Sequence, residues 1–497
     1  MLFRSLDIRG IYFSSEYKRF YPNKSLASHI LGFCNIDSRG AEGIEKGLDS
    51  YLLADVIQND GEKRQDDYGY NIQLTIDSVI QAAAEIKLRE AVEFEKASSA
   101  SLILLDGLTG EILSMANYPD FNPNQYEKYG QKYFRNTAIF NQFEPGSVFK
   151  IFSIASLLDS GVIDIDSRFF CDGLYSDEHF DINCTGNHGF VDVPGIFKFS
   201  CNDGTLQAVS SIPDYDFYHY MKSFGFGEKT DILLPGEQPG ILRDYENWSI
   251  RSMLSVPIGQ EISVNSLQMV QAATVFLNDG KMIKPYLVKK IFDRKNNTIK
   301  EYSRQEIREV VKPGISGLIL KAMTASTTEG GTVSTLEIPG ISFAAKSGTA
   351  EIYDSSIGAY SEDMFTSSLL AIFPYESPRY IVYAVFHKPS GEVKWGGEIG
   401  ARLINNFLSA LTGYLEIYPE DYLIQESNIA VNREYEKVIS LPAYMPDLTG
   451  LAAGDVPGIF SDIKLQVKVF GQGKVYRQNP APGKILNTGS TIEIYLQ

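Results

Sequence analysis

The 497-residue sequence contains no long hydrophobic run. No stretch approaches the roughly 20 apolar residues that a membrane-spanning helix needs, and we find no signal peptide. Positive charge is also in deficit, because 45 Lys and Arg residues stand against 62 Asp and Glu residues, for a formal net charge of −17. This balance argues against nucleic acid as a partner. Apolar residues still make up 44% of the chain, which is enough for a large core and about three domains.

Three short motifs stand in one order along the chain. They are Glu144-Pro-Gly-Ser147-Val-Phe-Lys150, then Ser200-Cys201-Asn202, then Lys346-Ser347-Gly348-Thr349-Ala350. Together they supply a serine nucleophile, two lysines, a second hydroxyl and an amide, which is the set of groups used by penicillin-recognising acyl transferases. Each motif alone is a weak signal. Ser-x-x-Lys recurs at Ser15 and Ser461, and Ser-x-Asn recurs at Ser263.

The first motif stands at the start of a predicted helix. Pro145-Gly146 precede Ser147, and apolar residues then recur at helical spacing until Asp159-Ser160-Gly161 ends the run. Lys150 follows three residues after Ser147 and shares a helix face with it, so its amine can reach the hydroxyl. Capping of the helix is the alternative role for Ser147.

The third motif continues a predicted strand. Ile341, Phe343 and Ala345 alternate along the chain up to Lys346, and Gly348 would let a ligand approach the backbone closely. A solvent-facing lysine on an edge strand is the alternative.

With these motifs, the chain resembles the class B penicillin-binding proteins, the monofunctional transpeptidases of bacterial cell-wall synthesis. The resemblance runs from about residue 18 to residue 413. The other shared segments are Arg19-Phe-Tyr-Pro22, Ala27-Ser-His-Ile-Leu-Gly32, Glu42-Gly-Ile-Glu45, Leu74-Thr-Ile-Asp77, Thr109-Gly-Glu-Ile-Leu113 and Ile258-Gly-Gln-Glu-Ile-Ser-Val264.

The resemblance implies a peptidoglycan D,D-transpeptidase that works through a serine acyl-enzyme, is the target of β-lactams and needs no cofactor for catalysis. Ser147 would attack the penultimate D-alanine of a stem peptide ending in D-Ala-D-Ala, with Lys150 as general base. Burial and the nearby charge of Lys346 would both lower the pKa of Lys150, as a base at neutral pH requires.

The other motif residues also receive roles from the resemblance. Ser200 would relay a proton to the departing D-alanine, and Asn202 would hold Lys150 and the substrate amide. Lys346 and the hydroxyls of Ser347 and Thr349, in a strand opened by Gly348, would bind the terminal carboxylate. Backbone amides of Ser147 and Thr349 would form the oxyanion hole.

Two other functions use the same residues. A D,D-carboxypeptidase or a β-lactamase would need an activated water to remove the acyl group, and we see no glutamate placed for that purpose. A non-catalytic β-lactam sensor or scaffold need not retain every catalytic residue, whereas this chain retains them all.

The expected fold is α+β, with helices on both faces of an antiparallel sheet. A helix from about Ile76 to Glu95 should lead to strands around Leu102 and Ile112. We expect a partial N-terminal pedestal over residues 1–70, a transpeptidase domain over 71–413, a connector over 414–440 and a small module over 441–497.

The C-terminal module resembles a PASTA domain. The resemblance rests on Met445-Pro-Asp-Leu-Thr-Gly450, Gln478-Asn-Pro-Ala-Pro-Gly483 and a final strand around Ile492 to Leu496. Pro457-Gly458 departs from the pattern, because it falls where the helix of the module should run. We therefore expect that helix to be short or kinked.

The N-terminus departs most from the family. Class B members begin with a cytoplasmic tail, a spanning helix and a pedestal, whereas this chain is inside the pedestal region by Arg19. We expect the sequence to be N-terminally truncated and the catalytic domain to lie outside the cell membrane. The implied partners are the stem peptide, β-lactams and, through the N-terminal region, a glycan polymerase of the shape, elongation, division and sporulation family.

Three of the four cysteines lie near a histidine, in the order Cys171, Cys184, His188 and Cys201. Three thiolates and one imidazole can form a closed structural zinc site. An exported compartment would instead permit a disulfide between Cys184 and Cys201, and buried free thiols are the third reading. Cys34 is remote in sequence and is expected to be an ordinary buried residue.

Overall fold

The computed structural model describes residues 18–53, 57–59, 62–64, 69–354 and 357–415, and in the C-terminal part 443–444, 448–449, 466–471, 474–482, 484–486 and 491–496. The chain divides into two compact units, Met1–Tyr418 and Pro419–Gln497, and each is described by itself. Along the described part of the chain, no helix combines the length and the apolar character needed to cross a bilayer.

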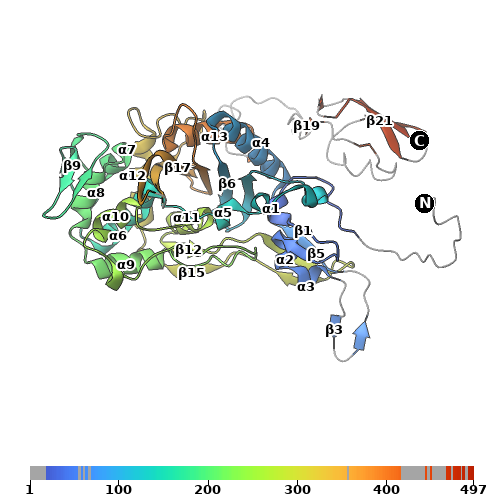
Figure 1. Cartoon of the computed structure of the whole chain (residues 1–497), viewed down its shortest axis with the longest axis horizontal. Coiled ribbons are helices and arrows are strands. Elements are labelled where there is room, and N and C mark those ends of the chain that lie inside the picture. Colours follow the sequence, from blue (N-terminus) through green and yellow to red (C-terminus); the bar gives the residue numbers. More distant parts are fainter. Residues whose placement is uncertain are drawn as a thin grey trace, which may run out of the picture. The chain divides into compact units, whose positions relative to one another are not determined.

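The larger unit is built on a five-stranded antiparallel sheet in the order β16-β17-β18-β6-β7. Two of its strands, β6 and β17, are labelled in Figure 1. The strands are β6 (Ser99–Asp106), β7 (Ile112–Tyr118), β16 (Ala344–Asp354), β17 (Ala359–Phe373) and β18 (Tyr380–His387). The strands predicted around Leu102 and Ile112 are thus β6 and β7. The strand that carries Lys346 is β16, at one edge of the sheet.

Helices cover both faces of this sheet. Successive residues of a strand point to opposite faces, so each strand contributes side chains to two cores. Leu102 and Leu104 belong to a core with α4 (Ser78–Glu95) and α13 (Gly396–Ser409). Ile103 and Leu105 belong to the opposite core. That second core includes α5 (Thr137–Phe140), α6 (Lys150–Ser160), α11 (Ser266–Ala273) and α12 (Ile315–Thr324). The predicted α+β class is confirmed.

The helix predicted from about Ile76 to Glu95 is α4, which begins two residues later than expected. Asp77 caps it, because its carboxylate accepts hydrogen bonds from the backbone N–H groups of Val79 and Ile80 at 2.9 and 3.1 Å. The cap explains why the aspartate of the Leu74-Thr-Ile-Asp77 segment stands where the helix starts.

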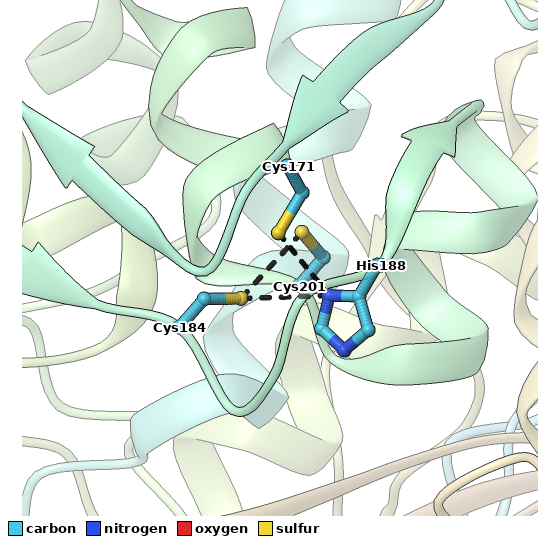
Figure 2. A group of neighbouring side chains, drawn as sticks. All are labelled: Cys171, Cys184, His188 and Cys201. Carbon is cyan, nitrogen blue, oxygen red and sulfur yellow. Dashed lines mark hydrogen bonds between the residues drawn. The ribbon is translucent and has the colours of Figure 1, made fainter.

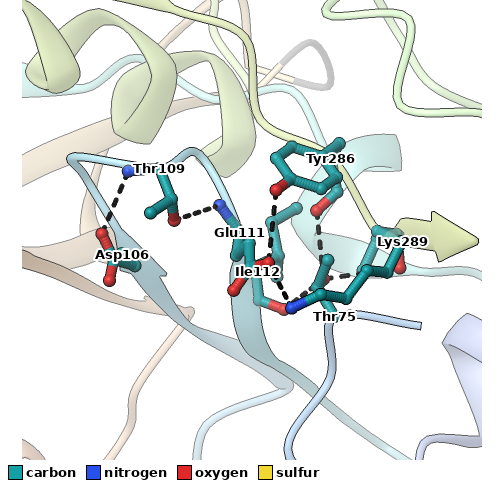
Figure 3. A network of polar contacts seen from close by, with 8 residues as sticks. Thr75, Asp106, Thr109, Glu111, Ile112, Tyr286 and Lys289 are labelled. Atoms are coloured by element: carbon teal, nitrogen blue, oxygen red, sulfur yellow. Dashed lines mark hydrogen bonds and ion pairs between the residues drawn. The ribbon is translucent and has the colours of Figure 1, made fainter. Parts of the chain in front are cut away.

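The threonine of the same segment joins separate parts of the fold (Figure 3). Thr75 Oγ1 donates to the carbonyl oxygen of Ile112, which opens β7, at 2.8 Å. Next to it, Glu111 accepts from Lys289 Nζ at 2.8 Å and from the Tyr286 hydroxyl at 3.3 Å. Two of the segments that carry the family resemblance therefore hold the β6-β7 hairpin against the strand β13 (Val288–Phe292).

Glu45 joins two other such segments near the N-terminus. Its carboxylate accepts from Arg19 Nε at 2.7 Å, from the Tyr21 hydroxyl at 3.3 Å and from Cys34 Sγ at 3.3 Å. Cys34 is half-buried rather than buried as predicted. Its thiol reaches this carboxylate from the short strand β1 (Phe33–Cys34) instead of pointing into a core.

The smaller unit contains a three-stranded sheet. The strand β23 (Thr491–Leu496) pairs in parallel with β20 (Gln466–Phe470) and antiparallel with β21 (Val475–Asn479). Pro457-Gly458 and nearly all of the expected connector lie outside the described residues. The short or kinked helix, the connector and the bounds of the four expected segments therefore stay predictions.

Candidate active site

Ser147 lies in a 3₁₀ turn, η4 (Gly146–Phe149), that runs directly into α6. Gly146 has φ +54°, a left-handed conformation that favours glycine. Ser147 is half-buried, whereas Phe149 is fully buried on the core side. The helix ends at Gly161, which has φ +78°. The predicted helix is confirmed, and its first turn leaves the Ser147 hydroxyl accessible.

Lys150 lies one turn after Ser147 and is fully buried. Its Nζ donates to Ser147 Oγ at 3.0 Å, to the Ser200 carbonyl oxygen at 2.7 Å and to Asn202 Oδ1 at 2.7 Å. The Asn202 amide nitrogen in turn donates to the Asn183 carbonyl oxygen at 3.0 Å. The amine is therefore held in one position beside the serine by two acceptors from the second motif.

Ser200 lies between α7 (Val193–Phe199) and α8 (Asn202–Val209) with φ +56°, a strained conformation for a residue other than glycine. Lys346 Nζ donates to Ser200 Oγ at 2.9 Å, and Lys150 Nζ lies 3.5 Å from the same oxygen. The hydroxyl of Ser200 thus stands between two amines. The structure brings the five predicted catalytic residues into one hydrogen-bonded chain that starts at Ser147.

Burial lowers the pKa of both lysines. It lowers the pKa of Lys150 to about 8, although the nearby thiols of Cys184 and Cys201 oppose this shift. Burial and then the charge of Lys150 lower the pKa of Lys346 well below its usual range. The predicted effect of burial on Lys150 is confirmed. The repulsion between the two lysines, however, lowers the pKa of Lys346 and not that of Lys150.

Gly348 brings β16 against the turn that carries Ser147. A Cβ atom at Gly348 would lie 2.6 Å from the Pro145 carbonyl oxygen and 3.0 Å from Val148 Cγ2. The group that lies close to Gly348 is therefore the protein's own backbone at Pro145. The sequence had led us to expect a ligand at this position. Thr349 Oγ1, one residue further on, accepts from the backbone N–H that opens α13, at 2.9 Å.

Glu144 belongs to the first motif, but no role was predicted for it from the sequence. Its Oε1 accepts from the backbone N–H of Glu261 at 3.0 Å and from the Tyr360 hydroxyl at 2.9 Å. Glu261 has φ +55° and belongs to the Ile258–Val264 segment of the family resemblance. Burial raises the pKa of Glu144. The carboxylate ties together three segments around Ser147, and these pairings span more than 100 residues of sequence.

Cys171, Cys184, His188 and Cys201 gather around one point, as Figure 2 shows. Cys171 Sγ and Cys184 Sγ lie 3.4 and 3.6 Å from His188 Nδ1, and Cys184 Sγ lies 3.7 Å from Cys201 Sγ. The thiols are free, and this separation is far beyond the roughly 2.05 Å of a disulfide bond. In this structure Cys184 and Cys201 are therefore not bonded, and the four side chains converge on a common centre. The Cys184–Cys201 disulfide stays an alternative prediction.

These three separations match edges of a tetrahedron around zinc, and all four ligand atoms lie within 4.8 Å of one another. Zn–S bonds of about 2.3 Å and Zn–N bonds of about 2.0–2.1 Å place the ligand atoms about 3.5–3.8 Å apart. The backbone N–H groups of Asn202 and Gly204 donate to the sulfurs of Cys184 and Cys201, each at 3.2 Å. Such outer hydrogen bonds orient metal ligands.

The charges in the cluster also fit a cation. The hydrogen bond between Cys184 and Cys201 lowers the pKa of the Cys184 thiol, while the same hydrogen bond and burial raise the pKa of Cys201. Neighbouring thiolates repel one another, so they cannot all ionise on their own. A divalent cation at the centre would remove this conflict.

Comparison with known protein families identifies both parts of the chain. The model of the penicillin binding protein transpeptidase domain matches residues 100–409. The model of the PASTA domain matches residues 443–497. The first match includes every residue of the site described above, from Glu144 to Tyr360.

Relatives cover most of the chain. Stage V sporulation protein D of Bacillus subtilis is 28% identical over 99% of this chain and 78% of its own length. Peptidoglycan D,D-transpeptidase FtsI of Escherichia coli is 26% identical over 86% of this chain and 72% of its own. The crystal structure of penicillin binding protein 3 from Mycobacterium tuberculosis, apo-form, superposes with a TM-score of 0.74 and 27% identity, over 80% of this chain and 91% of that one.

The same mycobacterial protein has been solved in complex with aztreonam, at a TM-score of 0.74 and 26% identity to this chain, over 80% of this chain and 91% of that one. The resemblance seen in the motifs is therefore confirmed by a family model, by relatives along the whole length and by a shared fold. The chain belongs to the penicillin-binding protein transpeptidase family, and within it to the class B enzymes that act as peptidoglycan D,D-transpeptidases.

Proposed function

We propose that Ser147 is the nucleophile of this D,D-transpeptidase and that Lys150 is its general base. The observation that carries the proposal is the 3.0 Å contact between Lys150 Nζ and Ser147 Oγ, with the amine fully buried and fixed by Ser200 and Asn202. Once Lys150 has lost its proton, the lone pair on Nζ can accept the proton of the hydroxyl as Oγ attacks.

The acyl transfer then follows from the same chain of contacts. Oγ of Ser147 bonds to the carbonyl carbon of the penultimate D-alanine, and the amide bond to the terminal D-alanine breaks. The leaving amine takes a proton through Ser200, whose Oγ lies between the two lysines. An amine of a second stem peptide then attacks the ester, and the crosslink forms as Ser147 regains its proton.

Substrate binding is assigned to the second and third motifs. Lys346, with the hydroxyls of Ser347 and Thr349, would bind the terminal carboxylate, and Asn202 would bind the substrate amide while it holds Lys150. The backbone amides of Ser147 and Thr349 would stabilise the oxyanion. The close packing of Gly348 on Pro145 supports this arrangement, because it brings the strand beside the serine.

The pH dependence of acylation should report the protonation of Lys150. Because the pKa of Lys150 is lowered to about 8, only the fraction of enzyme with a neutral amine can act, and this fraction grows as the pH rises through 8. We expect the rate of acylation by benzylpenicillin to fall about tenfold for each pH unit below 7. Stopped-flow measurements between pH 5.5 and 9 would test this, and a rate independent of pH over that range would contradict it.

Glu144 should act by positioning the turn of Ser147. We expect Glu144→Ala to slow acylation by benzylpenicillin about tenfold, because two hydrogen bonds beside the nucleophile are lost. Glu144→Gln keeps an acceptor for both donors and should retain most of the rate. The exposed Glu127, changed to alanine, is a matched control. An acylation rate in Glu144→Ala equal to that of the wild type would refute the assignment.

A structural zinc ion is proposed for the cluster of Cys171, Cys184, His188 and Cys201. The ion would take no part in acyl transfer. Its effect would be mechanical, because Cys201 lies between Ser200 and Asn202, and the backbone of Asn202 also donates to Cys184. Fixing these sulfurs would fix the position of both motif residues beside Lys150.

The proposed partners and location are those that the family resemblance implies. We propose that β-lactams acylate Ser147, since the mycobacterial relative is known in complex with aztreonam and with ampicillin. One relative is named a stage V sporulation protein and another a peptidoglycan D,D-transpeptidase. The catalytic unit would work on the outer side of the cell membrane, with the N-terminal region facing a glycan polymerase of the shape, elongation, division and sporulation family.

The test of the proposed function combines a drug and a substrate. The full chain is incubated with benzylpenicillin and examined by intact mass, and separately with a peptide ending in D-Ala-D-Ala and an acceptor amine. A stable penicilloyl adduct together with crosslinked peptide supports the transpeptidase. Catalytic consumption of the drug would instead identify a β-lactamase, and release of D-alanine without crosslinking a carboxypeptidase. An adduct without turnover of the peptide would identify a sensor or scaffold.

A further inference from the structure

A shallow pocket of about 340 Å³ lies outside the acyl-transfer machinery. It is lined by Phe140, Asn141, Gln142, Gln238 and His387. None of these residues has a role in the mechanism above. Three carboxamides, an imidazole and an aromatic ring are an unusual lining, because no side chain among them carries a fixed charge.

The sheet places this pocket on the same side as Ser147. Ala350 of β16 pairs with Thr366 of β17, which pairs with His387 of β18. A Cβ atom at Gly146 would lie 3.2 Å from the Ala350 Cβ, so Ala350 faces the turn that carries Ser147. Directly opposed residues on neighbouring strands point to one face. His387 therefore faces the same side, about 10 Å across the sheet from Ala350.

A second contact links the pocket to the nucleophile along the chain. The ring of Phe143 meets the ring of His387 edge to face, with centroids 5.3 Å apart. Phe143 precedes Ser147 by four residues, and Asn141 and Gln142 come immediately before it. The loop that leads into the nucleophile thus forms one wall of the pocket.

Several polar groups of the pocket have no partner among the described residues, although Gln238 Nε2 donates to the Gly236 carbonyl oxygen at 3.1 Å. His387 Nε2 is buried without a hydrogen bond, and its Nδ1 lies 3.4 Å from Thr366 Oγ1. Burial lowers the pKa of His387 to about 4, so the ring is neutral near pH 7. The side chains of Asn141 and Gln142 make no hydrogen bond to any described residue. These groups call for a neutral ligand rich in hydroxyl and amide groups.

We propose that this pocket binds an N-acetylated amino sugar of the peptidoglycan strand whose stem peptide occupies the site at Ser147. Carboxamides and a neutral imidazole complement the hydroxyl and acetamido groups of such a sugar, and the ring of Phe140 complements its apolar face. The distance also fits. A peptide residue extends at most about 3.3–3.6 Å, so three or four residues of stem peptide cover the about 10 Å between Ala350, beside the turn of Ser147, and His387.

The inference rests on the proposed function and is tested with two substrates on the full chain. One is a free stem peptide ending in D-Ala-D-Ala, and the other is the same peptide linked to an N-acetylated disaccharide. Release of D-alanine gives KM for each. We expect the wild type to have the lower KM for the linked substrate. Gln142→Ala and Asn141→Ala should raise that KM about three- to tenfold, as expected for one lost hydrogen bond.

A matched control and a direct binding measurement complete the test. Gln305→Ala removes an exposed glutamine outside the pocket and should keep the KM advantage of the linked substrate. Saturation-transfer NMR with the N-acetylglucosamine tetramer should show contact with the acetyl groups in the wild type and a weaker signal in Gln142→Ala. Equal KM values for the two substrates in the wild type, or an unchanged KM ratio in both variants, would overturn the inference.

The two hypotheses fail in different ways. If the proposed function fails, the wild type forms no crosslinked product from the free stem peptide and an acceptor amine, whatever the KM ratio of the two substrates. The glycan inference would fail alone if the adduct forms and D-alanine is released while the tetramer signal is the same in the wild type and in Gln142→Ala.

Discussion

Replacement of Ser147 by alanine is expected to abolish the penicilloyl adduct and to lower the release of D-alanine from a D-Ala-D-Ala peptide by about 10⁴-fold or more. The hydroxyl is the only group in the first motif that Lys150 can activate, and it lies 3.0 Å from the amine. No other hydroxyl in the hydrogen-bonded chain can take over. Ser200 Oγ, the nearest, accepts from the buried Lys346 and stands in a strained turn.

The substitution should leave the fold intact, because Ser147 is half-buried and its backbone, not its side chain, forms the 3₁₀ turn. Intact mass and thermal unfolding of the same sample separate loss of chemistry from loss of structure. Ser461→Ala is a matched control, since Ser461 begins a second Ser-x-x-Lys match. That variant should form the adduct at the wild-type rate. A penicilloyl group retained on Ser147→Ala would show that another residue is the nucleophile.

The parts of the site that lie close in sequence were predictable. Helical spacing alone placed Lys150 beside Ser147, because residues three apart share a face of a helix. The alternation of residues up to Lys346 likewise predicted the strand β16. The sequence could not show that this edge-strand lysine is fully buried, as it is in the structure. Its burial depends on Lys150 and Ser200, which come from distant parts of the chain.

The contacts that sequence reasoning missed are long-range ones. Glu144 was visible as a motif residue, but its partners Glu261 and Tyr360 come from separate segments. The reason for Gly348 was missed in the same way, because only the folded chain shows the Pro145 carbonyl that a Cβ would strike. Periodicity describes one element at a time. It does not indicate which elements pack against one another, and the contacts of Glu144 and Gly348 depend on that packing.

The cysteine cluster was only partly predictable from the sequence. The sequence identified the four residues, because three thiols and an imidazole recur within one short stretch, but it left zinc, a disulfide and free thiols open. Two features of the fold narrow the choice. The short strands β8 (Phe169–Cys171) and β11 (Gly189–Val191) pair so that Cys171 lies opposite the residue that follows His188. Cys201, at the start of α8, completes the group, with sulfur separations that suit a shared ion rather than one bond.

Loss of the metal is the second large effect that we expect. The purified chain should contain one equivalent of zinc, and Cys184→Ser should lose it together with about 3 kcal/mol or more of stability, because binding of a structural zinc ion contributes directly to folding. The rate of acylation by benzylpenicillin should fall as well. Without the ion, Cys184 no longer restrains the backbone of Asn202, and the acceptors that hold Lys150 can move.

Cys34→Ser is the matched control, because Cys34 is the one cysteine outside the cluster and contacts Glu45 instead. It should keep both the zinc and the acylation rate. Metal content by mass spectrometry, thermal unfolding with and without a chelator, and acylation of the same samples distinguish the outcomes. Zinc that stays bound in Cys184→Ser would rule out these ligands. A wild type that is free of zinc, does not respond to the chelator and is lighter by two hydrogens would establish a disulfide. Cys184 and Cys201 would then form the disulfide. Its reduction, rather than the loss of a metal ion, would change the position of Asn202.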